Sequence, residues 1–157
     1  MEKTNSYFNN LYETGCAFEA RRAAHKEKKQ SIIDTFGWDS PELKAWYDEY
    51  NAMKFPISDG ACKAFRAWKK SVSKDDDEVV VEDFCWDREV ADFLNTFREA
   101  GIKSFVYVNQ STAVMENLHA FVANGCTMLG LYTITRKENL YGSEESVEIP
   151  GIRFTID

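Results

Sequence analysis

Two short stretches hold side chains that could bind a small ligand. The stretch "FCWDRE" supplies Cys85 and Asp87, and "VNQST" supplies Asn109, Gln110 and Ser111. Each follows a strand-like apolar segment and precedes a helical one, so both would lie at the carboxyl edge of a parallel sheet, where ligands collect. These polar groups, together with the Trp86 ring between Cys85 and Asp87, predict a site for a small anion or an amide, in a ligand-binding protein or a small enzyme.

The same five residues also have structural interpretations. Asp87 and Ser111 are helix-capping types, Cys85 can fill a core, and Asn109 and Gln110 suit a tight loop. Neither stretch has the glycines that let a backbone wrap a phosphate, and no G-x-G-x-x-G or Walker pattern occurs in the sequence. A nucleotide enzyme is therefore not expected, and no cofactor is predicted.

Catalytic and metal-ligating residues are sparse. A nucleophilic pair of Cys85 and His119 would need His119 at the sheet edge, but this histidine falls about two turns into its expected helix. The four cysteines form no C-x-x-C pair, and the consecutive carboxylates of Asp75, Asp76 and Asp77 do not converge as a cation cage requires. We assign no catalytic residue and no metal, and the balance is against an enzyme.

Aromatic side chains in "KAWYDEYNAMKF" are candidates for binding a partner protein. Trp46, Tyr47 and Tyr50 belong to the residue types that dominate interface hot spots when they are exposed. The alternative is that these rings bury their helix against the sheet.

A basic stretch, "RRAAHKEKK", provides a second set of candidates, Arg22, His25 and Lys29. These three residues share one helical stripe with the apolar positions Phe8, Leu11, Gly15, Phe18, Ile32 and Phe36. A face of small residues lies beside that stripe: Cys16, Ala17, Ala20, Ala23 and Ala24. We expect the small face to pack on another helix and the basic residues to point to water, where they could also meet an acidic partner or the acidic half of the chain.

The periodicity predicts an α+β or α/β fold with a helical N-terminal region followed by a βαβαββ region. Residues 1–72 contain about three helices, the second capped by Ser40 and the third by Ser58 or Asp59. Residues 73–78 form an acidic, solvated linker. Residues 79–157 alternate strand and helix and form a four-stranded mixed sheet, with three parallel strands and an antiparallel last strand. The whole chain is expected to form one unit.

The last strand, "SVEIPGIRFTI", changes the parity of its apolar residues. They fall at odd positions up to Ile149 and at even positions from Ile152 onward. A bulge at Pro150-Gly151, after a turn near "KENLYGSEE", would place both sets on one face of the sheet.

Charge is distributed unevenly along the chain. The net charge is -7, and residues 79–157 hold 6 Lys and Arg against 12 Asp and Glu. This acidity disfavours direct nucleic-acid binding, which relies on cations that neutralise phosphates, and it leaves DNA mimicry as an alternative. No segment reaches the ~20 apolar residues that cross a bilayer, so no membrane association and a cytoplasmic location are expected.

The segment "DREVADFLNTFREAGIKSFVYVNQSTAVMENLHAFVANGCTMLGLYTITRKEN", residues 87–139, resembles small uncharacterised proteins carried on conjugative elements of gut bacteria. The resemblance includes no catalytic motif. It implies a bacterial, cytosolic accessory protein, and such elements often encode small acidic proteins that block host defence. We therefore expect a noncatalytic protein of a mobile element that acts by protein-protein interaction, with a ligand binder or small enzyme and an acidic DNA mimic as alternatives.

Overall fold

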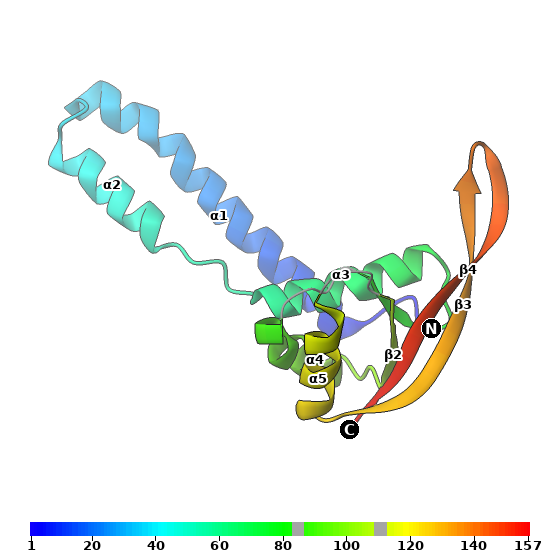
Figure 1. Cartoon of the computed structure of the whole chain (residues 1–157). Helices are drawn as coiled ribbons and strands as arrows, with labels where there is room; N and C mark the ends of the chain where they lie inside the picture. The colour runs from blue at the N-terminus through cyan, green and yellow to red at the C-terminus, as the bar shows by residue number, and fades with distance from the viewer. Residues whose placement is uncertain (83–86, 109–112) are drawn as a thin grey trace. The chain divides into compact units, whose positions relative to one another are not determined.

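The computed structural model describes residues 1–82, 87–108 and 113–157, and these form helices and a mixed sheet (Figure 1). The helices are α1 (Ser6–Phe36), α2 (Pro41–Ala52), α3 (Asp59–Ser73), α4 (Val90–Glu99) and α5 (Val114–Ala123), with a 3-10 turn at Asp87–Glu89. The strands are β1 (Val79–Val81), β2 (Ser104–Tyr107), β3 (Cys126–Leu140) and β4 (Ser143–Ile156). The predicted α+β class and the βαβαββ order are confirmed.

The chain divides into two units. Residues 9–57 form a helical unit of α1 and α2, whereas residues 1–8 and 58–157 form a sheet unit. The sequence predicts one unit with a helical region that ends at residue 72. Helix α3 instead packs on α4, where Gly60 allows so close an approach that an added Cβ would lie 2.5 Å from the carbonyl oxygen of Glu89. The third predicted helix therefore belongs with the sheet.

The sheet has the strand order β1-β2-β4-β3. Strand β1 pairs in parallel with β2, and β4 lies antiparallel to both β2 and β3. The first three strands consequently run in one direction and the last runs against them, as predicted. Strand β4 occupies the position between β2 and β3, so it joins the long β3-β4 hairpin to the rest of the sheet (Figure 1).

One face of the sheet carries the main aromatic core. Phe105 and Phe154 are neighbours on β2 and β4, with stacked rings whose centroids are 5.3 Å apart. Phe93 and Phe97 of α4 and Phe121 of α5 pack on this face, and all five rings are fully buried. Burial of large side chains of this kind contributes roughly 1.5–3 kcal/mol each.

The opposite face carries a second apolar cluster of Val80, Val106 and Ile134, with Val108 packed against it. This cluster explains the parity change in β4. Ile149 pairs with Ile134 and faces this second cluster, whereas Phe154 faces the aromatic core, so no bulge is needed at Pro150-Gly151. The predicted bulge was wrong.

The β3-β4 hairpin differs from prediction in its bulge and in its turn. Its register shift lies on β3 between Met128 and Gly130. The hairpin closes through Tyr141 and Gly142, both with positive φ, in place of the longer turn expected over 137–145. Positive φ at both central positions suits a two-residue hairpin turn, because it matches the twist of the flanking strands.

Helix signals read from the sequence were accurate in the N-terminal region. Ser40 caps α2 and accepts a hydrogen bond from the Leu43 N–H, and Ser58, the first of the two predicted candidates, caps α3. Helix α3 ends with Asp75 in a left-handed conformation at φ 58°, and the Asp76 N–H donates to the Ser71 carbonyl. This Schellman-type end turns Asp76 back toward the fold.

Candidate functional site

A ladder of stacked rings joins α1 to α2 in the helical unit. His25 stacks on Trp46 at 5.1 Å between centroids, and Trp46 stacks on Tyr50 at 5.2 Å, with interplanar angles of 11° and 10°. The Trp46 indole N–H donates to the His25 carbonyl at 2.9 Å, and His25 Nε2 lies 3.2 Å from the Trp46 carbonyl oxygen. Both side chains are buried. They hold the two helices together.

The predicted basic residues pack on the same rings. The guanidinium of Arg22 lies 5.1 Å from the centre of the Tyr50 ring, and the ammonium of Lys29 lies 5.3 Å from that of Trp46 and 4.8 Å from that of Tyr47. Cations over aromatic faces are attracted by the ring quadrupole, and their aliphatic stems cover apolar surface.

The orientation of α1 is therefore the reverse of the expected one. His25 is buried, Arg22 and Lys29 are half-buried, and the small residues Ala20 and Ala23 are exposed. Long cationic side chains can shield an aromatic face while keeping their charge at the edge, so the stripe that contains them could face α2.

Electrostatics at Tyr50 follow from this packing. Burial acts to raise the pKa of its phenol, but hydrogen bonds from Lys26 and Arg22 outweigh burial, so the pKa is lower than usual. The Arg22 Nε donates to the Tyr50 hydroxyl at 3.1 Å.

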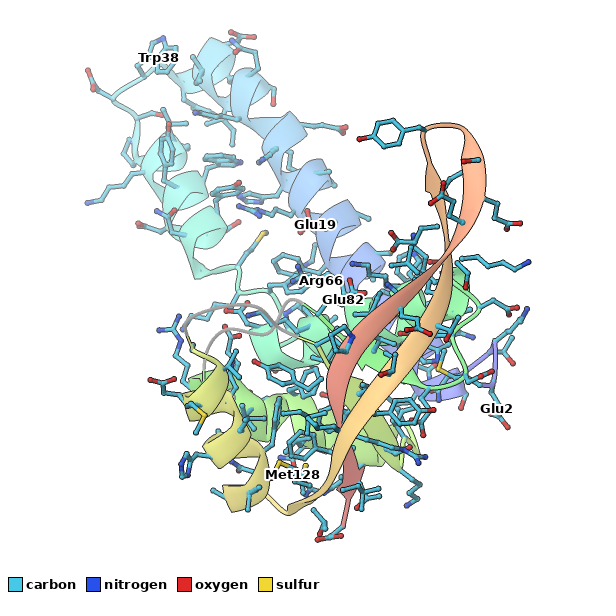
Figure 2. The ribbon with its side chains drawn as sticks, turned by 45° about the vertical axis from the view of Figure 1, so that its right-hand side comes forward. Glu2, Glu19, Trp38, Arg66, Glu82 and Met128 are labelled. Carbon is cyan, nitrogen blue, oxygen red and sulfur yellow. The ribbon has the colours of Figure 1, made fainter. Side chains whose placement is uncertain are left out.

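Of the partner-binding candidates, Trp46 has almost no free surface to offer, Tyr50 is half-buried and Tyr47 remains 39% exposed. The most exposed ring of the helical unit is Trp38, at 70%, in the turn between α1 and α2, with Phe36 beside it at 54% (Figure 2). The sequence analysis missed this pair. Its signal is an aromatic residue between the end of one helix and the cap of the next, where no helix face can bury it.

In the sheet unit, the loops that follow β1 and β2, where a ligand site was predicted, lie largely outside the described residues. Cys85, Asn109, Gln110 and Ser111 lie outside the described ranges. The backbone of Asp87 begins the 3-10 turn, and Glu89, not Asp87, is the N-cap residue of α4. The carboxyl ends of β1 and β2 do come together, since the Val108 N–H donates to the Val81 carbonyl at 3.0 Å.

A buried ion cluster lies on the valine face of the sheet. Arg136 of β3 donates from Nε and Nη2 to the two carboxylate oxygens of Asp76, at 3.0 and 2.6 Å, and from Nη1 to Glu82. The side chains of Arg136 and Asp76 are 2% and 1% exposed. Glu82 also pairs with Lys70 of α3. The expected solvated linker is thus wrong at Asp76, because Arg136, sixty positions later, neutralises the carboxylate that the core could not otherwise hold.

Charges in this cluster shift pKa values in opposite directions. Burial acts to raise the pKa of Glu82, but hydrogen bonds from Lys70 and Arg136 bring it below its ordinary value. The pKa of Arg136 is raised, chiefly by its hydrogen bonds to Asp76, so this guanidinium stays charged at any physiological pH.

A cavity of about 430 Å³ opens next to the cluster, between α3 and β1. Its apolar lining comes from Ala67, Val80, Val81 and Phe93. Its polar lining includes four basic residues of α3 and a single carboxylate, Glu82, which directly follows β1; Arg66 and Glu82 are both labelled in Figure 2. The cavity therefore reaches the carboxyl end of β1, the edge at which a ligand site was predicted, with a lining that sequence reasoning did not select.

Residues 63–156, more than half of the chain, match the family model described as a domain of unknown function, DUF7698. The chain belongs to the DUF7698 family. The DUF7698 match begins inside α3 and runs through β4, so it contains the cavity and the ion cluster and leaves out the helical unit. No curated protein and no solved structure matches the chain.

Two features are absent from the part of the chain that the structure describes. Across residues 1–82, 87–108 and 113–157, no group of three or more His, Cys, Asp or Glu side chains is arranged to hold a metal ion. Within the same ranges, no helix has the length and apolar character needed to span a membrane.

Proposed function

We propose that this protein is a noncatalytic binding module that docks a partner protein through the turn between α1 and α2. The observation that carries the proposal is the exposure of Trp38, at 70%, beside Phe36, at 54%. A tryptophan buries about 150–250 Å² of surface, so covering the exposed part of Trp38 is worth roughly 3–4 kcal/mol before the costs of association.

Charge around this turn defines the partner. Asp34, Asp39 and Glu42 are exposed on either side of the two aromatic residues, and no lysine or arginine lies between positions 34 and 42. The partner surface that fits is an apolar pocket with a rim of lysine or arginine. Such complementarity mainly raises the association rate and makes it sensitive to salt.

The ring ladder restricts the relative motion of the two helices that this turn joins. Because His25 and Trp46 fix α2 on α1, the turn that joins the helices is held at both ends. A preorganised aromatic residue loses less conformational entropy when it binds.

The test compares two exposed aromatic residues, one in each unit. The immobilised full-length protein is incubated with lysate from its native host, as wild type, Trp38→Ala and Tyr141→Asn. Tyr141 is fully exposed in the β3-β4 turn, and asparagine keeps the positive φ that this turn needs. The recovered partner is then purified and its dissociation constant measured for each variant.

We expect Trp38→Ala to weaken binding by at least about 30-fold, the effect of a hot-spot residue worth ~2 kcal/mol, and Tyr141→Asn to have no effect. Asp39→Asn should slow association and reduce its salt dependence. Failure to recover a partner, or a partner that tolerates Trp38→Ala, would contradict the proposal.

The biological setting is part of the proposal. The resemblance of residues 87–139 to accessory proteins of conjugative elements supports a cytoplasmic role in a bacterial mobile element, including inhibition of host defence. Expression in a restriction-proficient bacterium should then raise the transformation efficiency of unmodified DNA, and Trp38→Ala should remove the gain. An unchanged efficiency with the wild type would contradict the anti-defence role and leave the binding experiment to decide docking.

The two alternatives fare differently. The cavity at the carboxyl end of β1 supports a ligand-binding site, although its described lining differs from the predicted residues. DNA mimicry loses support, because several carboxylates of the acidic half are already in ion pairs and cannot imitate free phosphates. These are Glu82 with Lys70 and Arg136, Glu89 with Lys63, Glu138 with Lys74, and Glu144 with Lys137.

A further inference from the structure

The cavity between α3 and β1 has the size of a small-molecule site. Its volume of about 430 Å³ lies in the range of roughly 300–1,000 Å³ that ligand pockets occupy. Val80, Val81 and Phe93 line it and are themselves buried, at 2%, 1% and 0% exposure. With so little exposed surface they form the floor of the cavity, and half-buried Ala67 and the aliphatic stems of the lining lysines are the apolar groups that can cover the body of an organic molecule.

The polar side of the cavity carries an excess of positive charge. Lys63, Arg66, Lys69 and Lys70 line it from α3, and Glu82 is the one acidic residue among the described lining residues. Three of the cations, at positions 63, 66 and 70, share one helix face. Like charges at this spacing repel one another, so the helix gains stability when an anion lies between them.

These cations differ in whether a carboxylate of the protein pairs with them. Lys63 pairs with Glu89 at 2.5 Å, outside the cavity lining, and Lys70 pairs with Glu82. Glu82 also forms an ion pair with Arg136, so its carboxylate is already paired with two cations. Arg66 is exposed and forms no ion pair with any carboxylate in the described parts of the chain. A guanidinium in this position can bind a carboxylate, sulfonate or phosphate through two parallel hydrogen bonds.

We propose that this cavity binds a small amphipathic organic anion, whose apolar body lies against Ala67 and the lysine stems of α3 and whose carboxylate, phosphate or sulfonate group pairs with Arg66. The site lies within the DUF7698 region, whereas the proposed docking turn lies outside it. The inference is therefore independent of the proposed protein partner and can fail separately from it.

The experiment uses two dyes that share an aromatic body and differ in charge. The anionic probe is 8-anilinonaphthalene-1-sulfonate, and the neutral probe is N-phenyl-1-naphthylamine; both become fluorescent in apolar surroundings. The full-length protein is titrated with each dye as wild type, Arg66→Gln, Arg66→Lys and Lys44→Gln. Lys44 is exposed on α2, outside the cavity, and provides the matched loss of one charge.

We expect the anionic dye to bind the wild type saturably and its dissociation constant to rise about tenfold in Arg66→Gln, as the loss of one charge-assisted contact predicts. Arg66→Lys should recover part of the affinity, and Lys44→Gln should leave it within about twofold of the wild type, since distant exposed charges are screened. The neutral dye should bind all four proteins equally.

Three results would overturn the inference. The first is the absence of saturable binding of the anionic dye. The second is an equal affinity of the wild type and Arg66→Gln for that dye. The third is a parallel loss of both dyes in Arg66→Gln, because a change in the apolar cavity would then explain the effect without a charged contact.

Discussion

Removing the charge of Arg136 should open the sheet unit locally. In Arg136→Met, the Asp76 carboxylate loses two hydrogen bonds, at 2.6 and 3.0 Å, while its side chain stays 1% exposed. Removing one partner of a buried ion pair lowers the free energy of unfolding by about 3–5 kcal/mol, because the remaining charge has neither water nor a counterion. A typical domain is stable by only about 5–15 kcal/mol, so this change would remove a large share.

A second variant keeps the experiment informative if Arg136→Met does not fold. Replacing both partners, in the double variant Asp76→Leu and Arg136→Met, removes the unpaired charge as well as the pair. Buried pairs replaced by apolar residues are often neutral or stabilising. Glu82 keeps Lys70 as a partner in both variants. We expect the double variant to regain most of the stability that the single variant loses.

The assay is hydrogen exchange followed by mass spectrometry on peptides that cover β1 and β2. It reports the local free energy of opening in the sheet unit and does not require the two units to unfold together. Lys137→Gln is the control, since Lys137 neighbours Arg136 on the same strand but forms an exposed pair with Glu144, at 3.7 Å. That pair should contribute less than about 1 kcal/mol.

The reasoning would be refuted if Arg136→Met and Lys137→Gln changed exchange by the same small amount, since burial would then have no bearing on the strength of the pair. It would also be refuted if the double variant were less stable than Arg136→Met alone, because the unpaired carboxylate could not then be the source of the loss.

Three other experiments test the helix packing, the ion cluster and the thiols. Gly60→Ala should destabilise the protein by at least about 1 kcal/mol in urea denaturation, because the new Cβ would lie 2.5 Å from a backbone oxygen beside α4. Gly15→Ala should instead stabilise α1 by up to ~1 kcal/mol, because the nearest ring atom is 3.5 Å from the new Cβ. Similar effects at both sites would contradict the close packing of α3 on α4. Because the folded state lowers the pKa of Glu82, this carboxylate stabilises the fold at pH values above its ordinary pKa of 4.5, and that stability is lost as the pH falls through the lower pKa of the folded state. Glu82→Gln should therefore be less stable than the wild type near pH 7 and approach the wild-type stability in acid. A difference in stability that widens in acid would be inconsistent with this linkage. Burial raises the pKa of the Cys126 thiol to about 11, so iodoacetamide at about pH 8 should alkylate the exposed Cys16 well before Cys126, as peptide mass spectrometry can follow; equal rates would show that Cys126 is accessible.

Much of the fold can be predicted from local patterns. Ser40 followed by Pro41 marks a helix start, and the alternation of apolar strands with capped helices indicates both the element order and the directions of the first three strands. The parity of β4 misleads for a physical reason. A strand with a core on each face has no single apolar side, so an odd-to-even change reports two cores and does not require a bulge.

The candidate sites depend on contacts that local patterns do not record. The charged neighbours of His25 predict that it lies in water, yet Trp46, twenty-one positions later, covers it. Asp76 belongs to an acidic run, and its counterion is sixty positions away. The cavity beside Arg66 could have been suspected from the sequence, because Lys63, Arg66 and Lys70 recur at helical spacing and place three cations on one face of α3.

The strand order has a consequence for how the chain folds as it leaves the ribosome. Strand β4 is made after β3, yet β3 pairs only with β4 among the described strands, and β4 supplies the pairing that connects β3 to β2. Phe8, which emerges early, is fully buried against Trp68 of the sheet unit, and Asn5 donates to the Ala100 carbonyl at 2.8 Å. The helical unit can form from contiguous residues while synthesis continues. The sheet unit must hold an early segment unpaired until β4 has been made, and β2 and β3 are exposed to wrong pairing until then.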